Sequence, residues 1–118
     1  MAAEKVIAVD NDPQALLATR DNAERNNIAA QRISTYLPDE VPQDAVGHTM
    51  LANILAAPLI QLSPRLISLT AANGQLCLSG LLEHQIEAVS QPYREAFKFD
   101  SPSIESEWAQ LSARKHSR

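Results

Sequence analysis

Two polar side chains that follow apolar runs are the residues of this chain best suited to bind a ligand. Asp10 ends the run 6–9, and Asn53 ends an apolar segment that begins near residue 48. Where such runs form parallel strands, ligands bind outside the carboxyl ends, and an acid there can accept hydrogen bonds from both hydroxyls of a ribose. We therefore predict that Asp10 binds a ribose. For Asn53, whose amide both donates and accepts, spacing alone supports a ligand-binding role and a loop-anchoring role equally.

The other chemically versatile residues form no recognisable catalytic pattern. Ser79 ends a third apolar run but has no partner residue nearby that would make it a nucleophile. The histidines His48, His84 and His116 lack the spacing of metal ligands, so we predict no metal site. Cys77 is the only cysteine, which excludes an internal disulfide and a multi-cysteine zinc site. We expect Cys77 to be a buried, small, apolar residue.

The elements around Asp10 are the best defined in the sequence. Four consecutive apolar residues, 6–9, are typical of a strand that is buried on both faces. Asp12 can then accept a hydrogen bond from the free amides of a following helix, and Pro13 suits the first helical position. The apolar spacing over 14–26 predicts that this helix is amphipathic.

Strands and helices alternate along the rest of the chain. We predict a weak edge strand at 31–34, a strand at 48–54, and a helix with leucines at 59, 62, 66 and 69. That helix should kink or begin near Pro64 and close at 72–74. A strand at 75–80 and a helix through 82, 86, 89 and 93 follow, and two antiparallel strands, 97–100 and 107–114, are joined by 101–103. This order predicts an α/β fold with a mostly parallel sheet, three main helices and an antiparallel pair at the carboxyl end.

Composition limits the protein class. The chain has 118 residues, of which 45% are hydrophobic, so one domain is expected. No apolar run approaches the roughly 20 residues of a membrane helix, and the first residues lack the order of a signal peptide. A soluble, cytoplasmic protein without a membrane partner is therefore expected. The net charge of −4 and the scattered basic residues predict no direct nucleic-acid binding.

Five short motifs, taken together, resemble one protein family. They are 10–15 (DNDPQA), 20–26 (RDNAERN), 51–59 (LANILAAPL), 78–80 (LSG) and 107–108 (EW). Each is weak alone, but their order and spacing are similar to those of bacterial ribosomal protein L-eleven methyltransferase. The resemblance implies a Rossmann-like methyltransferase that uses S-adenosylmethionine to methylate amino groups, chiefly of lysines, on a large-subunit ribosomal protein. It also implies that Asp10 binds the ribose of the cofactor, and that Asn53 lies beside the reacting methyl group and orients the amine.

The sequence also departs from the family pattern. The family's first strand and glycine-rich turn should lie just before Val6, and five residues cannot hold them. Gly47, Gly74 and Gly80 are the only glycines and are not clustered. The family's amino-terminal substrate-binding domain has no counterpart either. We therefore expect residues 1–118 to be the carboxyl-terminal part of the catalytic domain, excised or truncated, and to be inactive alone. The sequence also shows no obvious base that would deprotonate a lysine.

The missing strand has a structural consequence. In the family it lies between the strands that end at Asp10 and Asn53, and without it both would expose unpaired edges. We predict that these two strands pair directly, or that another chain fills the gap by self-association. Two alternative functions stay open at this point. One is a nucleotide- or dinucleotide-binding module of Rossmann-like fold, and the other is a non-catalytic interaction domain in which Asp10 only caps a turn.

Overall fold

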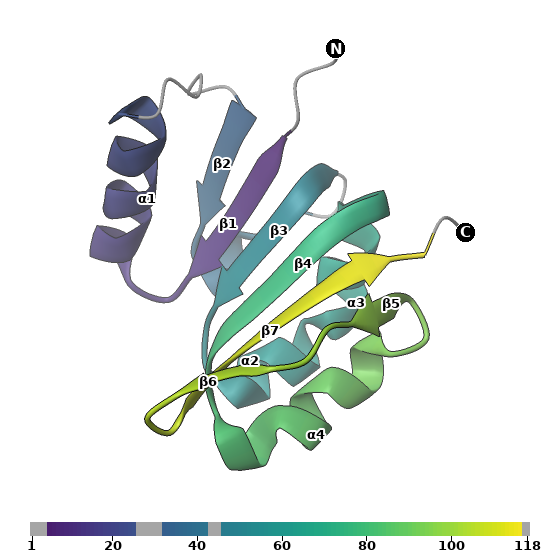
Figure 1. Cartoon of the computed structure of the whole chain (residues 1–118). Helices are drawn as coiled ribbons and strands as arrows, with labels where there is room; N and C mark the ends of the chain where they lie inside the picture. The colour runs from purple at the N-terminus through teal and green to yellow at the C-terminus, as the bar shows by residue number, and fades with distance from the viewer. Residues whose placement is uncertain (1–4, 26–31, 43–45, 117–118) are drawn as a thin grey trace.

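The computed structural model describes residues 5–25, 32–42 and 46–116, which form four α-helices and seven strands (Figure 1). In chain order these elements are β1 (Val6–Asp10), α1 (Pro13–Arg25), β2 (Ile33–Tyr36), β3 (Gly47–Asn53), α2 (Ala56–Gln61), α3 (Ser63–Leu69), β4 (Thr70–Leu82), α4 (Ile86–Ser90), β5 (Phe97–Phe99), β6 (Ser103–Glu105) and β7 (Trp108–Lys115). Short 3-10 turns cover Pro38–Glu40, Glu83–Gln85 and Gln91–Tyr93.

The strands form one sheet in the order β2-β1-β3-β4-β7-β5, and β6 pairs with β7 beside this path. The four strands from β2 to β4 run parallel. Strand β7 is antiparallel to β4, β5 and β6. The predicted α/β class, with a parallel sheet and an antiparallel carboxyl end, is confirmed. The weak strand does lie at the sheet edge, at Ile33–Tyr36, while Gln31 lies outside the described residues.

Strands β1 and β3 are direct neighbours. Their register runs from Val6 opposite Thr49 to Asp10 opposite Asn53 without interruption. The backbone of Lys5 continues this contact, because its carbonyl accepts hydrogen bonds from the amides of His48 (2.7 Å) and Thr49 (3.2 Å). Of the two arrangements predicted for these strands, the structure therefore has the direct pairing.

The two faces of the sheet are covered differently. Helices α2, α3 and α4 pack on one face, where the main apolar core includes Ile7, Met50, Leu78 and Leu111. Helix α1 lies against β1 and β2 at one end of the sheet (Figure 1). Strand β1 is buried on both faces, as predicted, because Ala8 and Asp10 are buried on the face opposite Ile7. None of the described helices covers the same face over β3, β4 and β7.

The second predicted helix is divided in two. Helix α2 ends at Gln61, and α3 begins at Ser63 with Pro64 in its first turn, as the proline predicts. The predicted end at 72–74 is wrong, because α3 ends at Leu69 and β4 begins at Thr70. The left-handed residue in 72–74 is Asn73, at φ 65°, and it lies within a register irregularity of β4.

The third predicted helix is much shorter than its apolar spacing indicates. Only Ile86–Ser90 is α-helical, with a 3-10 turn on each side, and Leu82 belongs to β4. Pro92 lacks an amide hydrogen, so it cannot continue the α-helical hydrogen bonds. The spacing nevertheless identified the buried side, because Val89 and Tyr93 are both fully buried.

The antiparallel pairing of β5 with β7 confirms the prediction for the carboxyl end. The expected linker at 101–103 is wrong, because Ser103 begins the additional strand β6. Strand β6 forms a hairpin with β7, in which Glu105 lies opposite Trp108. Ser106, between them, has a left-handed φ of 58°.

Candidate functional site

Asp10 is held by the turn that joins β1 to α1. Its side chain is buried, and Oδ1 accepts a hydrogen bond from the backbone amide of Asp12 at 2.9 Å. Asp12 in turn accepts one from the amide of Gln14 at 3.0 Å, and Pro13 is the first helical residue. The predicted cap by Asp12 is therefore confirmed. The backbone amide of Asp12 orients the Asp10 carboxylate at the end of the strand.

Asn53 lies directly across the strand pair from Asp10. The two residues are register partners, and Nδ2 of Asn53 donates a hydrogen bond to Oδ2 of Asp10 at 3.1 Å. The structure thus brings together the two residues that the sequence singled out, although they are 43 positions apart. Each oxygen of Asp10 accepts one of these bonds, and a carboxylate offers about four lone pairs in all, so both oxygens can accept further donors.

Gly80 allows β4 to approach Asn53 closely. It has a φ of 88°, which is a left-handed conformation that side chains disfavour. A Cβ atom at Gly80 would lie 2.7 Å from the carbonyl oxygen of Ile54 and 2.8 Å from Oδ1 of Asn53. The register of β4 with β7 also shifts here, between Leu78 and Leu81. A glycine at this bulge therefore leaves room for the Asn53 amide.

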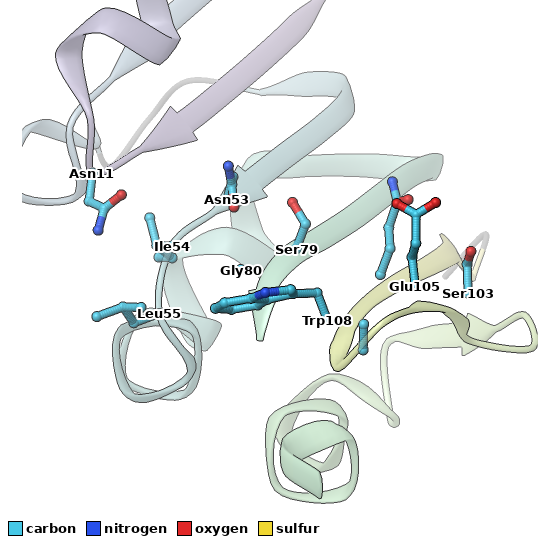
Figure 2. Close-up of a pocket in the computed structure, with 11 residues that line it drawn as sticks. Asn11, Asn53, Ile54, Leu55, Ser79, Gly80, Ser103, Glu105 and Trp108 are labelled. Atoms are coloured by element: carbon cyan, nitrogen blue, oxygen red, sulfur yellow. The ribbon is translucent and has the colours of Figure 1, made fainter. Parts of the chain in front are cut away.

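A cleft of about 560 Å³ opens beside Asn53 at the carboxyl ends of β3 and β4 (Figure 2). Its lining residues come from the β1–α1 turn, the ends of β3 and β4, and the β6–β7 hairpin: Asn11, Asn53, Ile54, Leu55, Ser79, Gly80, Ser103, Glu105, Trp108, Ala109 and Gln110. Asp10 lines a second hollow of about 240 Å³, which shares Asn53, Ser79 and Gln110 with the cleft. Asn53 therefore lies where the two cavities meet.

The hairpin wall of the cleft was not predicted as part of a site. Trp108 is 55% exposed, although tryptophan is a large apolar residue. In β7 the buried residues alternate with exposed ones, and Trp108 lies on the exposed side together with Gln110. A tryptophan on the polar side of an alternating strand is the signal that sequence reasoning could have used.

The remaining candidate residues are less informative. Cys77 is only partly buried, contrary to expectation, because it faces the uncovered side of the sheet, where Nε2 of Gln110 donates a hydrogen bond to its Sγ at 2.9 Å. Ser79 lines both cavities, but no histidine lines either of them. In the part of the chain that the structure describes, no group of three acids, histidines or cysteines could hold a metal ion.

Comparison with known proteins identifies the family. A family model described as Ribosomal protein L11 methyltransferase (PrmA) matches residues 1–116. The chain belongs to this family. A ribosomal protein L11 methyltransferase from Vibrio campbellii is 46% identical over 115 residues, which cover 98% of this chain and 39% of that protein. The chain thus spans well under half the length of the curated L11 methyltransferases that it matches.

Solved structures agree with this family and with the fold. The ribosomal protein L11 methylase from Lactobacillus delbrueckii subsp. bulgaricus is 31% identical, with a TM-score of 0.66 over 95% of this chain and 59% of that one. A structure from Streptococcus mutans, described as that of a methyltransferase in complex with SAH, has a TM-score of 0.54 at 16% identity, over 94% of this chain and 76% of that one. This second likeness shows the fold alone. Membership of the L11 methyltransferase family does not favour the alternative of a nucleotide-binding or non-catalytic interaction module.

None of the described helices has the length and apolar character needed to span a membrane.

Proposed function

We propose that this chain is the part of an S-adenosylmethionine-dependent protein methyltransferase that holds the cofactor's ribose and positions the amine. The whole enzyme would methylate amino groups, chiefly of lysines, on the large-subunit ribosomal protein for which the family is named. Family membership supports the reaction class. The observation that carries the site is the hydrogen bond between Asn53 and Asp10, at the junction of the two cavities. A ribosomal substrate implies a cytoplasmic location.

Asp10 fits a ribose. It ends a parallel strand, its carboxylate borders a hollow, and it keeps acceptor capacity beyond the bonds to Asp12 and Asn53. Two vicinal hydroxyls can both donate to such a carboxylate. S-adenosylmethionine, when bound, supplies a methyl group activated by attachment to a sulfonium sulfur. The proposed role of Asp10 is to hold the cofactor so that this methyl faces the cleft.

Asn53 is suited to orient the amine that accepts the methyl group. Its Nδ2 is engaged by Asp10, while no described residue donates a hydrogen bond to its Oδ1. An N–H of the neutral amine can donate to Oδ1, which directs the nitrogen lone pair along the cleft. With the amine held by Asn53, the nitrogen would take the methyl group, the C–S electron pair would stay on sulfur, and the extra proton on nitrogen would leave to water. This contribution of Asn53 is mainly one of positioning.

The amine must first lose a proton, because a lysine has a pKa of about 10.4 in water. Leu55 and Trp108 make one side of the cleft apolar, and an apolar surrounding lowers the pKa of an amine. The proposed route is deprotonation to water once the amine has entered this surrounding.

We expect this chain alone to bind the cofactor weakly and to lack turnover. Among the described residues, only Asp10 is proposed to hold the ribose, and no glycine-rich turn occurs among them.

Self-association is also proposed, through β2 and β5, which are the outer strands of the main path. They have only four and three residues, so the contact would be weak. Sedimentation velocity over a concentration series tests this, and a monomer at every concentration would contradict it.

Titration of the chain with S-adenosylmethionine, followed by calorimetry and by amide NMR shifts, tests the ribose site. We expect weak binding with shifts at the ends of β1 and β3, and loss of both in Asp10→Ala. Asp100→Ala is the matched control, because Asp100 is exposed and follows β5. Binding that survives in Asp10→Ala contradicts the ribose role. Tight binding with methyl transfer to the ribosomal protein contradicts the expectation of an inactive part.

A further inference from the structure

The cleft carries a charge that the proposed roles of Asp10 and Asn53 leave unexplained. Glu105 is the only residue with an ionisable side chain among those lining the cleft, and it is exposed. Among the described residues, no basic side chain forms an ion pair with Glu105. The ion pair found there joins Arg94 and Glu87. The cleft therefore presents one uncompensated negative charge, which favours a cationic ligand group.

The surface next to this charge is apolar. Trp108 is 55% exposed and Leu55 is 58% exposed, and both line the cleft. Large apolar side chains that are exposed together in a cleft mark a binding surface more often than single exposed ones do. The cleft thus combines an apolar wall with a single acid.

The hairpin makes Glu105 and Trp108 direct neighbours. Glu105 and Trp108 are register partners on antiparallel strands, so their side chains project from the same face of the hairpin. In Figure 2 the ring of Trp108 extends toward Leu55 and away from Glu105, whose carboxylate lies near Ser103, beside the backbone end of the tryptophan. A ligand that reaches Asn53 along the ring can therefore pass Glu105 first.

We propose that Glu105 is a substrate-binding residue that captures the ammonium group of the target lysine while the methylene stem lies against Trp108. A lysine has this combination of an apolar stem and a terminal charge. The proposal rests on the proposed function and adds a charged entry site to it. Glu105 is not proposed as the base that deprotonates the lysine. Its carboxylate stabilises the charged amine, so the lysine must leave Glu105 before it reacts at Asn53.

The single tryptophan of the chain allows a direct binding test. The probes are Nα-acetyl-lysine amide and its neutral Nε-acetylated counterpart, and the readout is Trp108 fluorescence at low salt. We expect the charged probe to bind about three- to five-fold more tightly, as for an exposed ion pair. Glu105→Gln should remove this preference. Glu107→Gln is the matched control, since Glu107 is exposed near the same turn but does not line the cleft.

Equal affinity for the two probes would overturn the proposal, and so would a preference that survives in Glu105→Gln or disappears in Glu107→Gln. Circular dichroism of both variants checks that each is folded. The titration with S-adenosylmethionine described above separates this proposal from the proposed function. If the unaltered chain shows no charge preference but still binds the cofactor, only the role of Glu105 is contradicted. If the unaltered chain shows the charge preference but does not bind the cofactor, only the methyltransferase site is contradicted.

Discussion

The side chain of Asn53 donates a hydrogen bond to the carboxylate of Asp10, at 3.1 Å, from the directly opposite position of the neighbouring parallel strand. The bond links the residue proposed to hold the ribose to the residue proposed to orient the amine. A change in either side chain should therefore affect the orientation of the other.

The first prediction concerns this bond. Asn53→Ala and Asp10→Asn should each lower the free energy of unfolding by about 1 to 2 kcal/mol. Asn53→Ala removes the donor of this partly buried bond, and Asp10→Asn removes the charge and leaves one acceptor oxygen for the two donors, Asp12 and Asn53. The double variant should lose less stability than the sum of the two single-variant losses, by at least about 0.5 kcal/mol. Urea denaturation measures all three values.

Asn11→Ala is the control for this cycle, because Asn11 lines the cleft but is exposed. Its effect should stay within about 0.5 kcal/mol. Fully additive losses at positions 10 and 53 would show that the two side chains do not interact in solution.

The second prediction concerns Gly80. Gly80→Ala should lower the free energy of unfolding by about 1 to 3 kcal/mol, because φ is 88° and the new Cβ would lie 2.7 Å from a backbone oxygen. The same Cβ would displace Oδ1 of Asn53, so the NMR signals of the Asn53 side-chain amide should shift.

Gly47→Ala provides the comparison for Gly80. Its Cβ would meet mainly the side chain of Ile7, at 2.9 Å, which can move more readily than backbone. We expect a smaller loss of stability and an unchanged Asn53 amide signal. Similar Asn53 shifts in both variants would argue against a specific role for Gly80 in positioning the amide.

The third prediction concerns pH. Tyr93 is fully buried, and its hydroxyl donates to the carbonyl of Leu59 at 2.6 Å. Burial raises the pKa of Tyr93 above its ordinary value. The folded state thus keeps the proton that the unfolded state releases from about pH 10 upward. The stability associated with this hydroxyl is therefore fully present below pH 10 and is lost as the pH rises further.

Tyr93→Phe should lower the free energy of unfolding at neutral pH by about 1 kcal/mol, through loss of the hydrogen bond. The variant should then lose less stability than the wild type above about pH 10, by up to roughly 1.4 kcal/mol per pH unit. Urea denaturation from pH 7 to 11 measures both effects, with Tyr36→Phe as a control for the other tyrosine. Parallel pH profiles for the wild type and Tyr93→Phe would contradict the prediction.

The fourth prediction concerns the hairpin turn. Ser106 has a φ of 58°, which costs a non-glycine residue roughly 1 kcal/mol or more. Ser106→Gly should therefore keep or raise the melting temperature, despite the greater freedom that glycine gives the unfolded chain. Ser101→Gly, outside the strands, should lower it slightly. A lower melting temperature in Ser106→Gly than in Ser101→Gly would show that the turn is not strained.

Sequence patterns predicted correctly those elements that form through interactions between residues close together in the chain. The run 6–9 and the Asp12-Pro13 pair predicted β1 and its link to α1, because a buried strand and a capped helix start need only neighbouring residues. The same reasoning missed the shortness of α4, where Pro92 interrupts a good apolar spacing, and the strand β6. All three β6 residues are exposed, so no buried pattern was available to indicate a strand.

The sequence by itself determined that Asp10 and Asn53 end apolar strands, and its motifs identified the family. Only the tertiary structure decided that β1 and β3 pair directly and that Asn53 bonds to Asp10, because register depends on which strands become neighbours. It also decided that Glu105 and Trp108 complete the cleft. These two residues reach the cleft because the antiparallel β6–β7 hairpin folds back beside the carboxyl ends of the parallel strands β3 and β4. No spacing along the chain encodes this contact.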